Sequence, residues 1–182
     1  LGMKNTHFVN DHGLEENDGS GNISTAYDMA ILTSYAYKND VFKEIFGTKN
    51  KVIKSDKKTY SWKNKNKILH SYDFITGGKT GYTIKARRTL VTTGEKDNKK
   101  IVIVTLNDGN DFTDHITLYQ QLFKKYEAIK VVDKNTFNIS TCDNCYIKND
   151  YYALVTDNEK GNLKVENELE SNNDGQLQML IR

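Results

Sequence analysis

Residues 77–83 read Gly-Gly-Lys-Thr-Gly-Tyr-Thr, and from this point the hydrophobic pattern of the chain has a period of two. Two runs rich in β-branched residues follow at 89–93 and 100–106, separated by a polar turn at 95–99. Alternation of this kind indicates strands, and two such runs joined by a short polar turn are typical of a hairpin. The sequence therefore predicts three consecutive antiparallel strands, of which residues 78–83 form the first.

Helical signals precede these strands. Thr25, with Asp28 three residues later, resembles a capping box, and the apolar spacing that follows predicts a helix of about 14 residues. Asp40 and Gly47 have the residue types expected at the start and the end of a second, shorter helix.

After the three strands the pattern becomes helical again. A third helix is expected there, capped by Thr113 or Asp114. Beyond about residue 126, short strand-like pieces occur at 131–132, 137–139, 152–155, 163–165 and 177–181. The sequence thus predicts an α+β fold, an antiparallel sheet flanked by helices, for residues 1–127, and a small all-β domain for residues 128–182.

Composition narrows the class of protein. The 182 residues carry a formal net charge of +2, with 27% charged and 37% hydrophobic residues. No apolar run is long enough to predict a membrane-spanning helix. This balance of charge also gives no ground for predicting a nucleic acid or an anionic membrane as partner.

Residues 49–70 are dense in lysine, with Tyr60 and Trp62 among the lysines. Aromatic rings between cations occur in platforms for single-stranded nucleic acid. Lysines also protect the edges of exposed sheets against aggregation. We favour the second interpretation, a solvated hairpin that pairs residues 52–53 with 60–62, and expect no nucleic-acid partner.

Cys142 and Cys145 form a single C-x-x-C between two strand-like segments. A structural zinc usually has four ligands, and no second pair of Cys or His completes such a set. A plain surface turn is the favoured interpretation, with a local disulfide and a metal or redox role as alternatives. We expect neither a metal nor a cofactor.

The stretch 77–81 invites comparison with the phosphate-binding loop G-x-x-x-x-G-K-[ST]. In that motif position 73 would be glycine, but it is Asp73, and the loop should open a helix. A β-branched strand follows instead. The comparison with a nucleotide site therefore fails on both points.

A peptide-binding edge strand suits the same residues better, because such a strand offers main-chain hydrogen bonds to an extended ligand. Lys79 supplies a positive charge and Thr80 a hydroxyl for the terminal carboxylate of a peptide. Gly81 has no Cβ, so a ligand can approach the backbone, and the N–H of Tyr82 can point at a developing oxyanion. We predict Lys79, Thr80, Gly81 and Tyr82 as substrate-binding residues, with Lys79 also catalytic.

Four stretches in a fixed order, 8–14, 24–30, 79–83 and 88–91, give the chain a family resemblance. It resembles the serine D-Ala-D-Ala carboxypeptidases of the low-molecular-weight penicillin-binding type, closely up to residue 126 and more loosely beyond. The resemblance implies a penicillin-recognising, β-lactamase-like fold. It also implies removal of the terminal D-Ala from peptidoglycan stem pentapeptides through an acyl-serine intermediate, reaction of β-lactams with the same serine, and an extracytoplasmic location.

Two motifs of that family, Ser-x-x-Lys with the nucleophile and base and a Ser-x-Asn, precede the matched stretches there and cannot be placed here. Ser55 and Lys58 have the first spacing, but they lie in the polar hairpin. Ser20 and Asn22 have the second, but they follow the stretch at 8–14. We expect the nucleophilic serine to lie outside this chain, on an N-terminal part of the same enzyme that is a separate fragment or was omitted.

Two other functions remain open, a β-lactamase and a non-catalytic wall-binding module of the same fold. The β-lactamase is disfavoured because a β domain follows and no deacylating Glu segment is recognised.

The surroundings of two further residues can also be predicted. Arg87, where relatives often have Gly, is expected to face water, and His115 is not expected to touch a ligand.

Overall fold

The structure is a computed structural model, and it describes residues 1–136, 149–164, 167–171 and 177–181. The chain divides into two compact units, one of residues 1–96 and 100–122 and one of residues 97–99 and 123–182. The domain boundary predicted after residue 127 remains a prediction. In the part of the chain that is described, no helix is long and apolar enough to cross a membrane.

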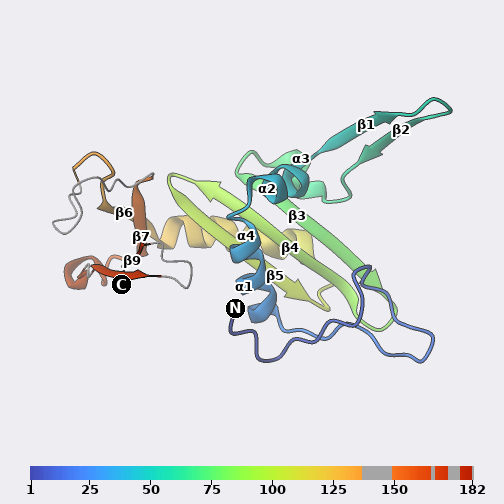
Figure 1. Ribbon diagram of the computed structural model, residues 1–182, viewed down its shortest axis with the longest axis horizontal. Coiled ribbons are helices and arrows are strands. Elements are labelled where there is room, and N and C mark those ends of the chain that lie inside the picture. The colour runs from blue at the N-terminus through green and yellow to red at the C-terminus, as the bar shows by residue number, and fades with distance from the viewer. Residues whose placement is uncertain (137–148, 165–166, 172–176, 182) are drawn as a thin grey trace. The chain divides into compact units, whose positions relative to one another are not determined.

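Helices and strands are interleaved between residues 26 and 125 (Figure 1). The helices are α1 (Ala26–Ala36), α2 (Asp40–Gly47), α3 (Lys67–Ser71) and α4 (Asp111–Lys125). The strands are β1 (Asn50–Lys54), β2 (Thr59–Lys63), β3 (Ile75–Thr83), β4 (Arg87–Lys96) and β5 (Lys99–Leu106).

The three strands predicted around the Lys-Thr-Gly stretch are confirmed. They form one sheet in the order β3-β4-β5, and β3 pairs antiparallel with β4, with Lys79 opposite Val91. Asp97 and Asn98 connect β4 to β5 with φ values of 51° and 61°, because a two-residue hairpin loop needs this left-handed backbone. Together with the helices, the sheet gives the predicted α+β fold.

The hairpin predicted in the lysine-rich segment is also confirmed. β1 and β2 pair antiparallel, with Ile53 opposite Tyr60, and every residue of the two strands is exposed. Ser55 and Lys58 close the turn between them. The N–H of Ser55 donates to the carbonyl of Lys58 at 2.9 Å, and the Ser55 hydroxyl accepts from the N–H of Lys58 at 3.1 Å. Their Ser-x-x-Lys spacing is therefore that of a turn.

α1 begins where predicted and is shorter than expected. The side chain of Thr25 accepts from the N–H of Asp28 at 3.1 Å, and the helix ends at Ala36 after 11 residues. The buried carboxylate of Asp28 accepts hydrogen bonds from the N–H of Asn5 at 2.9 Å and the hydroxyl of Thr6 at 2.7 Å. This carboxylate thus ties the N-terminal segment to α1 instead of closing a capping box.

The start of α2 differs by one residue from the prediction. Asn39, not Asp40, caps the helix, and its side chain accepts from the N–H of Phe42 at 3.0 Å. Gly47 ends α2 as predicted, but packing is the reason for the glycine. A Cβ at this position would lie 2.5 Å from the carbonyl oxygen of Thr76 on β3. The short α3 was not predicted, because its five residues are too few to show a period.

The start of α4 was predicted wrongly. The helix begins at Asp111, two to three residues before the expected cap at Thr113 or Asp114, and both of their N–H groups donate to the carbonyl of Asn110. Asp111 is 2% exposed, and its carboxylate accepts from the guanidinium of Arg88 at 2.5 Å. This contact with a distant strand holds the chain at Asp111, and no local sequence pattern reports it.

α4 packs on the sheet through a buried polar cluster. His115 is fully buried, with its Nδ1 2.8 Å from the hydroxyl of Thr92 on β4 and its Nε2 3.1 Å from the hydroxyl of Thr105 on β5. The hydroxyl of Tyr119 lies 3.0 Å from that of Thr92. A Cβ on Gly94 would be 2.5 Å from the Tyr119 ring, so the ring lies directly on the backbone of β4.

The second unit consists of strand pairs. β6 (Glu127–Val132) pairs antiparallel with β7 (Tyr151–Val155), and β8 (Asn167–Ser171) pairs with β9 (Leu177–Ile181). The strands predicted at 131–132, 152–155 and 177–181 are confirmed, whereas β8 was not predicted. Residues 163–164 follow a 3-10 turn and belong to no strand. The expected strand at 137–139, Val165, and the pair Cys142 and Cys145 lie outside the described residues.

The burial of His115 predicts a loss of stability in mild acid. Burial lowers the pKa of His115 from 6.5 to about 4, although Asp111 and Asp108 oppose this shift. Between these two values the unfolded chain binds a proton that the folded chain excludes. We therefore expect stability to be fully present above about pH 6.5 and to fall toward about pH 4, by on the order of 3 kcal/mol.

Urea unfolding across this pH range measures the effect. His115→Gln removes the titrating ring and should flatten the dependence in that window. A variant with the same pH dependence as the parent would show that His115 is not its source.

Candidate functional site

The four predicted substrate-binding residues lie in succession on β3. Lys79 and Tyr82 are exposed, and Thr80 and Gly81 are half-buried. In the strand order of the sheet, β3 lies at one edge and pairs only with β4 within the described part of the chain. The outer side of β3 therefore presents main-chain N–H and C=O groups, and an extended peptide can pair with such an edge.

Alternation along the strand sorts these side chains onto two faces. Lys79 and Gly81 share the face of Gly77, against which α2 packs, and Thr80 and Tyr82 share the other face. The ammonium group of Lys79 donates to the carbonyl of Thr80 at 2.5 Å. The cation thus lies beside the backbone of the edge strand, where the carboxylate of a bound peptide can reach it.

Two helices hold the first half of β3 through glycines. A Cβ on Gly77 would lie 2.5 Å from the ring of Phe46 on α2. A Cβ on Gly78 would lie 2.4 Å from Nδ2 of Asn66, the residue before α3. Larger side chains at these two positions would separate the helices from the strand. The backbone directly before Lys79 is therefore fixed by close packing.

Asn66 was not recognised in the sequence. It is fully buried, and neither its Oδ1 nor its Nδ2 has a hydrogen-bond partner among the described residues. A buried amide of this kind is costly, which makes Asn66 a notable neighbour of the candidate site. Its position before a short helix, at the end of the lysine-rich segment, carries no sequence signal that would have singled it out.

Gly81 has a close neighbour within the sheet. Its cross-strand partner is Thr89 on β4, and a Cβ on Gly81 would lie 2.4 Å from the Oγ1 of Thr89. The packing of the sheet therefore favours glycine here even without a ligand. The close approach of a ligand to Gly81 remains a prediction.

Two adjacent arginines at the start of β4, directly after the turn from β3, lie in different surroundings. Arg87 is exposed, as expected, and has a φ of 59°, a left-handed backbone that glycine adopts more easily. Arg88 lies over the ring of Phe112 at 5.2 Å and bonds to Asp111, and this hydrogen bond raises the pKa of Arg88. The start of β4 is thus anchored to the start of α4.

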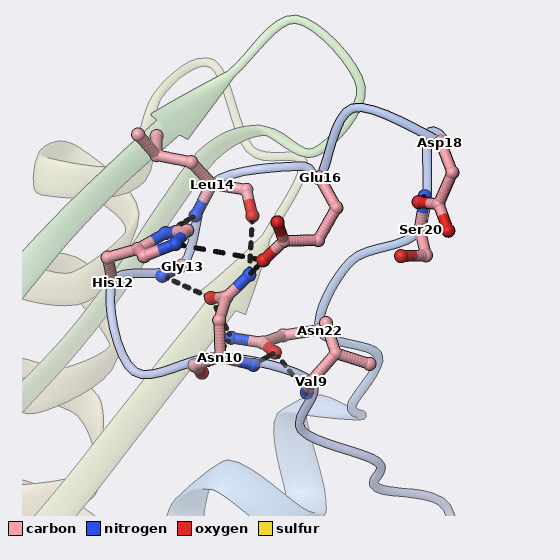
Figure 2. A network of polar contacts seen from close by, with 9 residues as sticks. All are labelled: Val9, Asn10, His12, Gly13, Leu14, Glu16, Asp18, Ser20 and Asn22. Carbon is pink, nitrogen blue, oxygen red and sulfur yellow. Dashed lines mark hydrogen bonds and ion pairs between the residues drawn. The ribbon is translucent and has the colours of Figure 1, made fainter.

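The stretch at 8–14 forms a loop closed by two asparagines (Figure 2). The side chain of Asn10 donates to the carboxylate of Glu16 at 2.6 Å and accepts from the N–H of Gly13 at 2.9 Å. The side chain of Asn22 accepts from the N–H of Asn10 at 3.2 Å and donates to its carbonyl at 3.0 Å. Asn22, which has the Ser-x-Asn spacing with Ser20, therefore helps to hold this loop in place.

The same loop is bonded to the end of β3. The hydroxyl of Thr83 donates to the carboxylate of Glu15 at 2.6 Å, and this hydrogen bond lowers the pKa of Glu15. The ammonium group of Lys85 donates to the carbonyl of Gly19 at 3.3 Å. The segment that follows the stretch at 8–14 is thus held against the end of β3, although the two are far apart in sequence.

The arrangement can hold a carboxylate-terminated extended chain but assigns no nucleophile. Ser55 lies in the β1–β2 turn, and the N–H of Ser20 donates to the carboxylate of Asp18 in the N-terminal loop (Figure 2). Neither serine belongs to β3. Among the described residues, no group of three or more His, Cys, Asp or Glu could hold a metal ion.

Sequence comparison connects this geometry to known proteins. Residues 1–110 match the sequence profile of the D-alanyl-D-alanine carboxypeptidases. The D-alanyl-D-alanine carboxypeptidase DacB2 of Mycobacterium tuberculosis is 34% identical over 106 residues, which cover 58% of this chain and 36% of that protein. The D-alanyl-D-alanine carboxypeptidase DacF of Bacillus subtilis is 30% identical over 139 residues. These residues cover 74% of this chain and 35% of that protein.

The chain spans about a third of the length of these relatives, given the shares of 36% and 35%. The crystal structure of a D-alanyl-D-alanine carboxypeptidase from Mycobacterium tuberculosis matches with a TM-score of 0.61 and 28% identity, covering 68% of this chain and 48% of that one. The predicted penicillin-recognising fold is thereby confirmed. Because the profile covers more than half of the chain, this protein belongs to the D-alanyl-D-alanine carboxypeptidase family.

Proposed function

We propose that the chain is the sheet-edge part of a peptidoglycan D-Ala-D-Ala carboxypeptidase. In this proposal Lys79, Thr80, Gly81 and Tyr82 bind the C-terminal end of a stem pentapeptide. The observation that carries it is the exposure of Lys79 on an edge strand whose outer main-chain groups face away from β4. Membership of the family supports the class of reaction.

The peptide binds by adding to the sheet. Its backbone pairs with the outer edge of β3, which supplies affinity without requiring particular side chains. The terminal carboxylate accepts hydrogen bonds from the ammonium group of Lys79 and the hydroxyl of Thr80, and bonds between charged partners are stronger than neutral ones. This capture of a free carboxyl end explains why a carboxypeptidase would place a lysine here.

The chemistry is acyl transfer to a serine that the proposal places outside this chain. Its hydroxyl attacks the carbonyl carbon of the penultimate D-Ala, and an adjacent base takes the proton. The N–H of Tyr82 donates to the oxyanion that forms. The C–N bond then breaks, D-Ala leaves as a protonated amine, and water hydrolyses the acyl-serine ester to regenerate the hydroxyl.

The proposal has three partners: the peptidoglycan stem peptide, β-lactams and the N-terminal part of the same enzyme. A β-lactam would acylate the same serine when its amide bond opens. Since peptidoglycan lies outside the cytoplasm, the proposed site of action is extracytoplasmic. The N-terminal part would bring the nucleophile and its base to the exposed side of Lys79.

Labelling with a fluorescent penicillin separates this function from its two alternatives. The complete carboxypeptidase should retain a slowly hydrolysed adduct. A β-lactamase should turn the penicillin over quickly, and a non-catalytic wall-binding module should remain unlabelled.

Substitution of Lys79 tests the proposed carboxylate contact. In the complete enzyme, Lys79→Ala should slow acylation by about tenfold or more, because it removes a charge-assisted hydrogen bond to the ligand. The thermal midpoint should hardly change, since the Lys79 side chain is exposed. Lys100→Ala, on the opposite edge strand of the same sheet, is the matched control and should acylate like the parent. Equal acylation rates in the Lys79 variant and the parent would remove Lys79 from the site.

A double-mutant cycle separates the two reasons for a glycine at position 81. Gly81→Ala should destabilise the fold by about 1–3 kcal/mol because its Cβ meets Thr89, and Thr89→Ala should restore most of that loss. If a ligand also approaches the backbone closely, the double variant should be stable in urea yet slow to react with penicillin. A double variant that regains full acylation would limit the role of Gly81 to sheet packing.

A further inference from the structure

The positive charge of the chain is concentrated in the β1–β2 hairpin and the residues that flank it. Residues 49–67 contain eight lysines and one acidic residue, Asp56, a net charge of +7. Because the whole chain carries only +2, the remaining residues together carry −5. Lysines that merely protect sheet edges do not require such segregation, whereas an anionic partner would be attracted to it.

Aromatic side chains lie in a row with these cations. Lys58, Tyr60 and Trp62 occupy alternate positions along one face of the hairpin. The ammonium group of Lys58 lies 5.1 Å from the centre of the Tyr60 ring, and that ring stacks on Trp62 with 5.6 Å between centroids. Trp62 nevertheless remains 53% exposed. A large exposed aromatic ring at the end of an ordered row is typical of a contact surface.

An open groove of about 300 Å³ lies beside Trp62, between α2 and the hairpin. Its apolar side includes Trp62 and Ile45, which is 69% exposed. The other residues that line it are Glu44, Thr48, Lys49, Asn50, Lys51, Lys63 and Asn64. Three lysines against one carboxylate give this groove an excess of positive charge.

Hydrogen bonds fix the base of this groove. The N–H of Asn64 donates to the carbonyl of Lys49 at 2.8 Å, and its side-chain amide donates to the carbonyl of Thr48 at 3.1 Å. His70 Nε2 lies 3.0 Å from the carbonyl of Asn64. The hairpin is thereby joined to the end of α2 and to α3, so the groove and the start of β3 share the same supports.

We propose that this groove, lined by Trp62, Ile45 and the three lysines at 49, 51 and 63, is a second binding site for the peptidoglycan strand, remote from the reacting peptide end. A sugar ring has a flat face of C–H groups that can lie on an indole. The carboxylates carried by the strand and its stem peptides match the lysines. The identity of this partner rests on the proposed function.

The shape of the hairpin favours a polymer laid in the groove over the two other anionic partners. The tip of the hairpin, Ser55–Lys58, is polar, so the aromatic residues are not placed for insertion into a bilayer. Tyr60 is 40% exposed, but its ring stands between Lys58 and Trp62, whereas a single-stranded nucleic acid uses a succession of free rings. A second contact on the same strand would raise the effective concentration of the peptide end at β3.

Trp62 is the only tryptophan of the chain, so its fluorescence reports on this groove directly. We expect titration with a soluble disaccharide-peptide fragment of peptidoglycan to change that fluorescence. Lys49→Gln, Lys51→Gln and Lys63→Gln combined should weaken binding about tenfold. Amidation of the carboxylates of the fragment should weaken it similarly. The matched control, Lys96→Gln, Lys100→Gln and Lys124→Gln combined, changes the net charge equally and should bind like the parent.

Binding to insoluble peptidoglycan provides a second readout. Trp62→Ala should lose this binding, and Trp62→Tyr should keep most of it. Circular dichroism verifies that each variant is folded. A control triple variant that loses as much affinity as the groove variant would overturn the proposal. So would anionic vesicles or a single-stranded oligonucleotide that bind as tightly as the fragment, with the same dependence on the three lysines.

Acylation distinguishes this site from the proposed function. The groove variants keep Lys79, so the complete enzyme carrying them should react with a fluorescent penicillin at the parental rate. Fragment binding without any penicillin labelling of the parent enzyme would defeat the proposed reaction while leaving the groove intact. Labelling without fragment binding at Trp62 would defeat the groove alone.

Discussion

β3 can lie against two helices only because Gly77 and Gly78 have no side chains. At these positions a Cβ would come within 2.5 Å of the Phe46 ring and 2.4 Å of the Asn66 amide. This close packing covers the strand up to the residue before Lys79, and from Lys79 onward the residues of β3 are exposed or half-buried. The boundary between a closely packed and a more accessible half of one edge strand is what would make residues 79–82 available to the proposed peptide ligand.

The far end of the strand is held by different contacts. Thr83 bonds to Glu15 in the N-terminal loop, and Arg88, at the start of the next strand, bonds to the buried Asp111 of α4. On the face covered by α4, His115 is bonded to the hydroxyls of two strands. A strand that is fixed at both ends, in a sheet supported by α4, would lose little conformational entropy if a peptide added to its free edge, which favours the proposed binding.

Local patterns sufficed to predict much of this architecture. The period of two predicted β3, β4 and β5, and the Thr25 signal predicted the start of α1. The placement of the candidate residues on an edge strand also followed from the sequence. What failed depends on contacts between distant residues, because the start of α4 is set by the ion pair with Arg88. The lack of room for a Cβ at Gly81, opposite Thr89, depends on strand register, and the burial of Asn66 has no local signal.

Amide hydrogen exchange along the two edge strands of the sheet tests the central claim most directly. The complete enzyme would be compared with and without a D-Ala-D-Ala peptide or a bound β-lactam. We expect the ligand to slow exchange at amides of residues 79–83 that face outward from β3, while exchange on β5 stays unchanged. Unaltered exchange throughout β3, or protection confined to β5, would contradict a site built on the free edge of this strand.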